Sequence, residues 1–252
     1  MQTFLVSGAG SGIGRAIANK LASEDQKVIL LGRIDAKLKQ TKEKLQNPAR
    51  HQVIVADVCD KNAIGKGLRA CGLTHLDGVV ANAGIGGENI YGPTDRWDKI
   101  ISINLTGTYL LLNECLPYLK KQPQGFKHIV IISSILARLG IPNYSAYCAS
   151  KAGLLGLMRS WAAQYARDKI LVNAICPGWV ETDMAKQGIQ AYADTVNKSY
   201  DQALQEQMSM VPLQKMSQPE EVANLVYFLL GEDQTSFTGQ TLDINNGALM
   251  PN

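Results

Sequence analysis

Short apolar runs alternate with amphipathic segments along almost the whole chain. The runs have the length and aliphatic content of buried strands, and we expect strands at Thr3–Ser7, Lys27–Leu31, Gln52–Val55, Leu76–Val80, His128–Ser133, Leu171–Ile175 and Thr241–Ile244. The intervening segments show helical spacing, and we expect helices at Gly14–Glu24, Lys37–Leu45, Thr94–Lys120, Ala146–Arg167 and Pro219–Leu230. Near-continuous apolar strands separated by helices are typical of a parallel sheet covered on both faces. The pattern therefore predicts one α/β domain over residues 1–252, with a doubly wound, seven-stranded parallel sheet.

Residues 183–210 interrupt this alternation. They are polar and helix-prone, and they follow the sixth expected strand and its Pro177-Gly178 turn. A long insertion at the carboxyl edge of a parallel sheet lies where ligands bind in this architecture. We interpret it as a substrate lid; the alternative is a surface excursion without a role.

Composition narrows the class of protein. The chain is 46% hydrophobic and 19% charged, with a net charge of +3 from scattered basic residues, which is ordinary for a globular protein and argues against a nucleic-acid partner. Its 5 cysteines are odd in number and lack metal-type spacing, so we expect free thiols in a reducing compartment and no metal site. No segment has the length or flanks of a transmembrane helix or signal peptide. We therefore expect a cytoplasmic protein without a membrane partner.

A glycine-rich turn joins the first expected strand to the first helix. It comprises Gly8, Gly10, Gly12 and Gly14, with Ser11 and Ile13 between them. Glycines permit a tight turn and let a pyrophosphate approach the N–H groups at a helix N-terminus. Because the turn opens a strand–turn–helix unit at the start of the chain, it predicts a dinucleotide site.

A second group of residues predicts proton transfer to a carbonyl oxygen. Tyr147 and Lys151 are four residues apart on one helix face, and Ser134 ends an apolar strand thirteen residues before Tyr147. An ammonium about 4 Å from a phenol is expected to lower the phenol pKa from about 10 towards about 7. Hydride transfer to a carbonyl leaves negative charge on oxygen, which Ser134 can hydrogen-bond and Tyr147 can protonate. Ser133 lacks this spacing and is the weaker candidate.

Together these motifs resemble the short-chain dehydrogenase/reductase family, beginning with the spacing Gly8-x-x-x-Gly12-x-Gly14. Asn104, Ser134, Tyr147 and Lys151 match the family's catalytic tetrad in order and spacing, and the resemblance implies that Asn104 holds a water linking Lys151 to solvent. The resemblance implies that the chain binds a nicotinamide cofactor. The resemblance assigns cofactor binding to Gly8, Ser11, Gly12, Ile13, Gly14, Arg33, Asp57, Val58, Asn82, Ala83, Gly84, Tyr147, Lys151, Pro177, Gly178, Val180 and Thr182.

Three positions depart from the family pattern. Ser7 replaces the usual threonine and keeps its hydroxyl, Ala81 replaces the first asparagine before Asn82, and Asn246-Gly247 replaces a pair of glycines. None of them removes a catalytic group.

The end of the second strand bears on the choice of cofactor. Gly32 stands where an acidic residue would bind the ribose of NAD, and Arg33 follows it. A guanidinium matches a phosphate in charge and geometry, which favours NADP. NAD is not excluded, because Ser11 occupies the place of the family's second basic residue.

The substrate is predicted only as a class. Leu136, Ile141, Tyr144, Trp179 and Met184 are expected to face a small carbonyl or alcohol substrate. The segment 177–184 is similar to 3-oxoacyl-thioester reductases, and the long lid resembles polyketide ketoreductases and 3-hydroxybutyrate-type enzymes. We therefore expect an NADP-dependent oxidoreductase acting on a ketone or secondary alcohol, with a 3-oxoacyl thioester as one candidate.

Other functions stay open at this point. One is an NAD-dependent dehydrogenase of a secondary alcohol or hydroxy acid. A non-catalytic cofactor sensor is disfavoured because all four tetrad residues are present, and an extended epimerase or dehydratase because its glycine spacing differs. The resemblance also implies a homotetramer formed through the helices at 94–120 and 146–167 and through a C-terminal edge.

Overall fold

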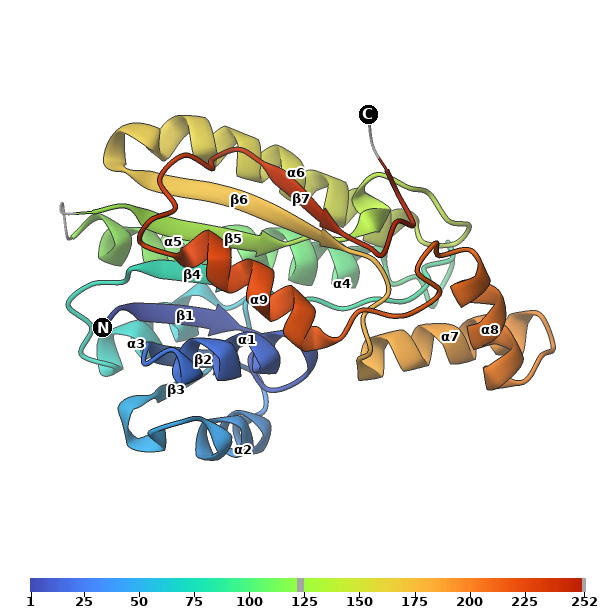
Figure 1. The fold of residues 1–252 in the computed structure, drawn as a ribbon, viewed down its shortest axis with the longest axis horizontal. Helices are drawn as coiled ribbons and strands as arrows, with labels where there is room; N and C mark the ends of the chain where they lie inside the picture. Colours follow the sequence, from blue (N-terminus) through green and yellow to red (C-terminus); the bar gives the residue numbers. More distant parts are fainter. Residues whose placement is uncertain (122–124, 251–252) are drawn as a thin grey trace.

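The computed structural model describes residues 1–121 and 125–250, and its centre is a parallel sheet with the strand order β3-β2-β1-β4-β5-β6-β7 (Figure 1). The strands are β1 (Thr3–Ser7), β2 (Lys27–Gly32), β3 (Gln52–Val55), β4 (Gly78–Ala81), β5 (Lys127–Ile132), β6 (Ile170–Pro177) and β7 (Thr241–Ile244). The helices are α1 (Gly12–Ser23), α2 (Asp35–Lys44), α3 (Lys61–Ala70), α4 (Trp97–Ile101), α5 (Gly107–Lys120), α6 (Ser145–Tyr165), α7 (Asp183–Thr195), α8 (Tyr200–Ser209) and α9 (Pro219–Leu230). The doubly wound, seven-stranded α/β fold predicted from the sequence is confirmed.

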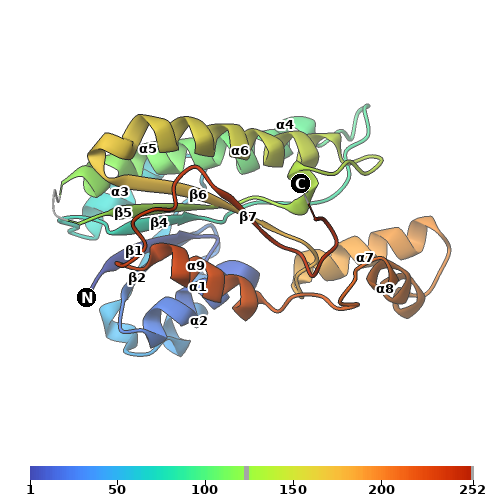
Figure 2. The same cartoon turned by 45° about the horizontal axis from the view of Figure 1, so that its top comes forward.

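Helices cover both faces of the sheet, which explains why its strands are apolar at consecutive positions. Leu5 and Ile129 belong to one core with residues of α3, α5 and α6. Val6 and Val130 belong to the other core with residues of α1 and α9. Figure 2 shows these two helical layers on opposite sides of the strands. Alternate side chains of a strand point to opposite faces, so a strand buried on both faces carries few polar residues.

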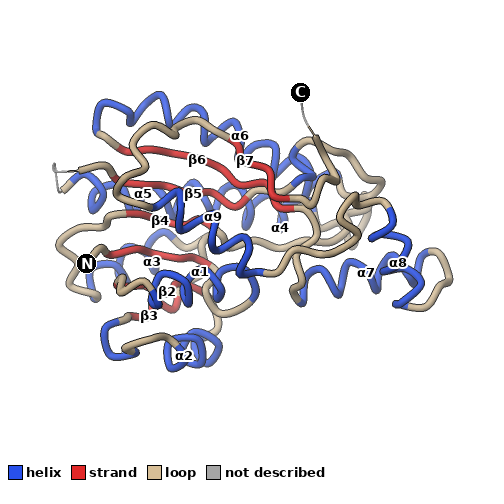
Figure 3. The backbone as a smooth tube through the Cα atoms, viewed as in Figure 1, coloured by secondary structure: helices blue, strands red, loops and turns tan. Residues whose placement is uncertain are grey.

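The strand order reverses at β1, which pairs with β2 on one side and β4 on the other. The two connections therefore leave in opposite directions and open a crevice at the carboxyl ends of these strands. Loops gather at this end of the sheet (Figure 3). This geometry places the glycine turn after β1 beside the segment after β4.

The predicted helix Thr94–Lys120 is wrong in two respects, its start and its continuity. Helix α4 begins at Trp97, where the Asp95 carboxylate accepts a hydrogen bond from the Trp97 N–H at 2.9 Å. A single π-helical turn at Ser102–Thr106 then separates α4 from α5. Asn104 lies in this turn, a conformation often found at functional sites. The hydrophobic spacing does not reveal it, because the same apolar face continues through the turn.

Helices α7 and α8 occupy the segment predicted as a lid and project beyond the carboxyl ends of the strands (Figure 1). Ile189, Ala193 and Ala203 form a small core of their own, against which Trp179 packs. Ser199 begins α8 with a capping box completed by Gln202. Within the described residues, no helix is both long and apolar enough to cross a membrane.

Candidate active site

The glycine turn after β1 has a geometry that requires glycine. Gly8 and Gly12 have φ angles of +66° and +49°, a region that other residues rarely adopt. A Cβ on Gly8 would lie 2.8 Å from Nδ2 of Asn82, and one on Gly14 would lie 2.3 Å from the Gly8 carbonyl oxygen. The turn therefore packs backbone against backbone and leaves the N-terminus of α1 accessible.

Ser7 and Asn82 join this turn to the end of β4. The Ser7 hydroxyl accepts hydrogen bonds from the N–H groups of Asn82 and Ala83, at 2.9 and 3.0 Å. The Asn82 side chain in turn donates to the Ser7 carbonyl at 3.0 Å. Two of these bonds use the hydroxyl and one the main-chain carbonyl, and serine supplies both groups, so the departure from the usual threonine leaves the junction intact.

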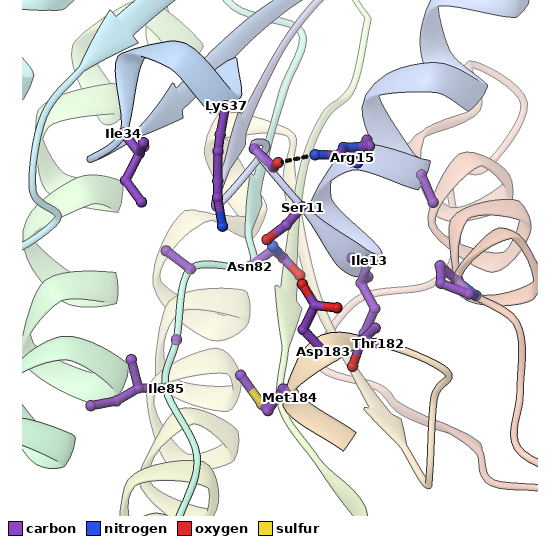
Figure 4. A pocket seen from close by; sticks show the side chains of 18 of the residues that line it. Ser11, Ile13, Arg15, Ile34, Lys37, Asn82, Ile85, Thr182, Asp183 and Met184 are labelled. Atoms are coloured by element: carbon purple, nitrogen blue, oxygen red, sulfur yellow. Dashed lines mark hydrogen bonds between the residues drawn. The ribbon is translucent and has the colours of Figure 1, made fainter. Parts of the chain in front are cut away.

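A cavity of about 820 Å³ opens over the turn (Figure 4). Many residues predicted from the sequence line it: Gly8, Ser11, Gly12, Ile13, Arg33, Asp57, Val58, Asn82, Ala83, Gly84, Thr182 and Met184. The Ser11 side chain makes no capping hydrogen bond to α1, so the N–H groups of the first helical turn are available to an anion. A cavity of this size, with a glycine cradle at a helix N-terminus, fits a dinucleotide.

Two cations of the cavity wall lie near the ends of β2 and the glycine turn. Nη1 of Arg33 lies 3.7 Å from Oδ2 of Asp57, and both side chains are half-exposed. Lys37 points into the cavity beside Ser11 (Figure 4), and a Cβ on Gly10 would lie 3.1 Å from the Lys37 Cβ. No ion pair of Lys37 occurs in the part of the chain that the structure describes.

Lys37 is not predicted from the sequence as a site residue, because the sequence pattern places it only at the start of an expected helix. Other unanticipated lining residues are Arg15, Asn19, Ile85, Ile103, Gln218 and Glu220. Arg15 is used internally, since Nη2 donates to the Gly10 carbonyl at 2.6 Å. The position of Lys37 in the first turn after a cofactor-reading strand is the signal that identifies it in retrospect.

Gly84 connects the cavity to the predicted catalytic residues. A Cβ on Gly84 would lie 3.2 Å from Oδ1 of Asn104 and 3.6 Å from Nζ of Lys151. Asn104 is fully buried, accepts a hydrogen bond from the Ile85 N–H at 2.8 Å and donates to the Ile85 carbonyl at 3.0 Å. Its side-chain amide also donates to Oγ of Ser150 at 3.1 Å, and its main-chain carbonyl accepts from the Thr108 hydroxyl at 2.8 Å. A further donor at Asn104 would therefore use the second lone pair of that carbonyl.

The two serines at the end of β5 have different surroundings. The Ser133 hydroxyl donates to the Lys151 carbonyl at 2.9 Å and so fastens β5 to α6. The Ser134 hydroxyl accepts a bond from the Leu136 N–H at 3.1 Å and interacts with the Tyr147 phenol, which it stabilises in the ionised form. Ser134 is thus the serine next to the phenol, as its spacing in the sequence predicts.

The expected lowering of the Tyr147 pKa by Lys151 is wrong for this structure. Burial raises the pKa of Tyr147 to about 12, and the hydrogen bond with Ser134 only partly offsets it. Burial also lowers the pKa of Lys151 to about 8. Nζ of Lys151 donates to the Ile132 carbonyl at 3.0 Å and lies 5.6 Å from the Tyr147 ring centroid. Loss of hydration around both groups therefore outweighs the attraction assumed from sequence spacing.

Some residues of the segment after β6 are placed away from the cavity wall. Pro177 and Val180 are buried, and Val180 packs in the core shared with α1 and α9. A Cβ on Gly178 would lie 3.0 Å from the Cα of Asn245, so this glycine faces the end of β7. Of the four positions assigned here by resemblance, the structure brings Thr182 to the cavity.

Of the five residues expected to face the substrate, some lie near Tyr147 and others do not. A Cβ on Gly86 would lie 3.3 Å from the Met184 sulfur and 4.0 Å from Cε2 of Tyr147, so Met184 of α7 reaches the catalytic end. Tyr144 contacts Tyr147 edge to face, with 6.5 Å between ring centroids. Leu136 lies in the turn after Ser134, and Ile141 is exposed. Trp179 instead packs under α7, against the small core of the lid.

No cluster of three or more metal-ligating side chains occurs among the described residues. Ser134, Tyr147 and Lys151 do not line the cavity themselves, but Lys151 lies behind its wall at Gly84 and Tyr147 lies next to Gly86. A cavity suited to a dinucleotide beside these residues is typical of an NAD(P)-dependent oxidoreductase of CH–OH and C=O groups, which this chain is. The chain belongs to the short-chain dehydrogenase/reductase family, and the family model described as enoyl-(acyl carrier protein) reductase matches residues 8–248.

Relatives and solved structures agree with this assignment. The chain is 35% identical to a 3-oxoacyl-(acyl-carrier-protein) reductase of Rickettsia prowazekii over 99% of this chain and 97% of the relative. It is similar to actinorhodin polyketide ketoreductase with NADPH, with a TM-score of 0.92, 31% identity and coverage of 98% and 97% of the two chains. It is also similar to a 3-oxoacyl-(acyl-carrier-protein) reductase with bound NAD from Brucella melitensis, with a TM-score of 0.85, 29% identity and coverage of 99% and 92%.

Proposed function

We propose that the protein is an NADP-dependent reductase that converts a ketone, in the form of a 3-oxoacyl thioester, to a secondary alcohol. The observation that carries this proposal is the convergence of Asn104 and Lys151 on Gly84, which lines the dinucleotide cavity, with Tyr147 on the same helix as Lys151 and hydrogen-bonded to Ser134. The 3-oxoacyl reductases and the polyketide ketoreductase among the similar proteins support a 3-oxo substrate.

The chain's own residues supply the binding of the cofactor. The N–H groups at the start of α1 hold the pyrophosphate. Asp57 lines the cavity at the position that binds the adenine ring in the short-chain dehydrogenase/reductase family. Arg33 provides positive charge at the adenosine end, which supports NADP over NAD. Lys37 lies over Gly10 of the glycine turn, where its charge acts on the pyrophosphate. When bound, the nicotinamide cofactor donates or accepts the hydride.

Ser134 and Tyr147 act on the substrate oxygen. The Ser134 hydroxyl donates a hydrogen bond to the oxygen as negative charge develops, and the Tyr147 phenol gives it a proton. Because burial raises the pKa of Tyr147 to about 12, the phenol keeps its proton at neutral pH, as reduction requires. Lys151 stabilises the phenolate that remains after transfer, and a water on the Asn104 carbonyl returns a proton through Lys151.

The segment 183–210 acts in this proposal as the lid over the substrate. Met184 at the start of α7 contacts the loop facing Tyr147, so closure of α7 brings an apolar side chain onto the substrate. Tyr109 of α5 is 48% exposed and in edge contact with the buried Trp161 of α6. We include in the proposal a cytoplasmic homotetramer formed through this face of α5 and α6.

The test mixes the purified protein with acetoacetyl-CoA and either NADPH or NADH, and follows the absorbance of the reduced nicotinamide. The proposal predicts reduction with NADPH at a kcat/KM at least about 10-fold above that with NADH, which corresponds to about 1.4 kcal/mol. Absence of thioester reduction, together with NAD-dependent oxidation of 3-hydroxybutyrate, would replace it with the dehydrogenase alternative. Cofactor binding without turnover of either substrate would support the sensor alternative.

A further inference from the structure

The catalytic helix α6 receives its N-terminal cap from a distant loop. Tyr144, at the N-cap position, makes no side-chain capping bond. Oδ1 of Asn89 instead accepts a hydrogen bond from the Ala146 N–H at 2.8 Å. The Ser145 hydroxyl lies 3.2 Å from Oδ1 and 3.1 Å from Nδ2 of Asn89. The residue that follows Ala146 is Tyr147, so this cap holds the turn that carries the phenol.

Asn89 also connects α6 to the helix that leads to Asn104. Nδ2 of Asn89 lies 3.4 Å from Oδ1 of Asp95, the carboxylate oxygen that caps α4 through the Trp97 N–H. The Asn89 N–H donates to the Asn143 carbonyl at 2.7 Å. Asn89 is 8% exposed, so it is largely withdrawn from water, and loss of its side chain would leave the Ala146 N–H without this acceptor.

The loop that carries Asn89 is also linked to α6 through Asn104, at Ser150, which follows Tyr147 in the helix. Ile85 exchanges two hydrogen bonds with the Asn104 side chain, which donates to Oγ of Ser150 at 3.1 Å. Tyr147 therefore lies between two attachments, one made by Asn89 and one by Asn104. Gly86, between Ile85 and Asn89 in the chain, faces Tyr147 and Met184.

We infer that Asn89 is a positioning residue, which sets the phenol of Tyr147 against the substrate oxygen by fixing the first turn of α6 to the start of α4. The inference rests on the proposed function, because it assigns Tyr147 the proton transfer. Asn89 itself contacts neither the cavity nor the phenol. Its loss is therefore expected to lower kcat without changing cofactor affinity.

The first experiment compares Asn89→Ala with a control cap. Asp60 caps α3 through the Asn62 and Ala63 N–H groups, both at 3.0 Å, and does not line the cavity. With acetoacetyl-CoA and saturating NADPH, Asn89→Ala is expected to lower kcat at least about 10-fold, with the NADPH Kd within about two-fold of wild type. Asp60→Ala is expected to lower the Tm similarly and leave kcat within about two-fold. Equal kcat values for the two variants would overturn the inference.

If Asn89→Ala does not fold, exchanging the amide of Asn89 and the carboxylate of Asp95 tests the contact between these two side chains in a folded protein. Asn89→Asp keeps the acceptor for Ala146 but places a carboxylate against Asp95, and it is expected to lower kcat. Adding Asp95→Asn restores one carboxylate and one amide across the 3.4 Å contact and is expected to recover kcat at least about 5-fold. A kcat for the double variant at or below that of Asn89→Asp would contradict the inference.

Hydrogen exchange separates this inference from the proposed function. The amide of Ala146 is expected to exchange at least about 10-fold faster in Asn89→Ala, and at the wild-type rate in Asp60→Ala. If the wild-type protein reduces no thioester, the proposed function fails, whereas the exchange result still reports whether Asn89 holds α6. Unchanged exchange at Ala146 would overturn the positioning inference whatever the activity.

Discussion

Lys151 donates a hydrogen bond from Nζ to the main-chain carbonyl of Ile132, 3.0 Å away on β5. The ammonium is thus held by the sheet, while the main-chain carbonyl of Lys151 accepts a hydrogen bond from the Ser133 hydroxyl. These two bonds lock α6 against β5 at the point where the catalytic residues meet. They also place a charge in a largely dry environment, which is why the pKa of Lys151 falls to about 8.

Replacement of Lys151 by methionine is expected to stabilise the protein while abolishing turnover. Folding lowers the lysine pKa from 10.5 to about 8, so below about pH 8 the folded state must keep a buried charge that it disfavours. Allowing for the lost bond to Ile132, we expect Lys151→Met to raise the free energy of unfolding by about 2 kcal/mol near pH 7. Urea unfolding measures this difference.

The stability difference between the wild-type protein and Lys151→Met is expected to depend on pH. Between about pH 8 and 10.5 the unfolded chain retains the lysine proton and the folded protein has released it, so wild-type stability rises with pH relative to Lys151→Met. The advantage of the variant should therefore shrink over this window. An advantage that grows with pH would show that burial does not depress the lysine pKa.

The two serines at the end of β5 should differ in their effect on catalysis. Ser134→Ala removes the hydroxyl beside Tyr147 and is expected to lower kcat by about 10²- to 10³-fold. Because its bond from the Leu136 N–H is also lost, we expect a stability loss similar to that of Ser133→Ala, so the two variants differ in kcat. Ser133→Ala removes the bond to the Lys151 carbonyl and is expected to cost about 1 kcal/mol of stability, with a smaller loss of kcat. Steady-state kinetics and thermal unfolding of both variants test the assignment, and a larger kcat loss in Ser133→Ala would reverse it.

Arg33→Ala is expected to weaken NADPH binding far more than NADH binding. A charge-assisted bond to the 2′-phosphate is worth about 1.5–3 kcal/mol, so the NADPH Kd should rise roughly 10- to 100-fold while the NADH Kd stays within about two-fold. Lys39→Ala is the matched control, because Lys39 pairs with Asp35 on α2 and does not line the cavity. Fluorescence titration with both cofactors gives the four constants, and equal losses for the two cofactors would mean that Arg33 does not read the phosphate.

Lys37→Ala is expected to act differently. Because Lys37 lies over Gly10 of the glycine turn, its charge should act on the pyrophosphate that both cofactors share. We expect the Kd values for NADPH and NADH to rise together, by roughly 3- to 10-fold at low ionic strength, with the difference diminishing in salt. A loss confined to NADPH would move Lys37 to the 2′-phosphate instead.

The sequence predicts the sheet, and the proximity of Ser134 to Tyr147, because both depend on local rules. Apolar runs specify buried strands, and Ser134, Tyr147 and Lys151 follow from spacing along one strand end and one helix. The π turn at Asn104, the placement of Trp179 under α7 and the role of Lys37 were not predicted, because each depends on which distant segments pack together. The pKa of Tyr147 was predicted in the wrong direction for the same reason, since burial is a property of the fold.

The most direct test of the central claim is the turnover of Tyr147→Phe, measured together with its affinity for NADPH. The ring and its contact with Tyr144 remain in this variant, and only the proton-donating hydroxyl is lost. The account predicts that kcat with acetoacetyl-CoA falls by about 10²- to 10⁴-fold or more, while the NADPH Kd stays within about two-fold. Turnover close to that of the wild-type protein would contradict the assignment of Tyr147 as the proton donor.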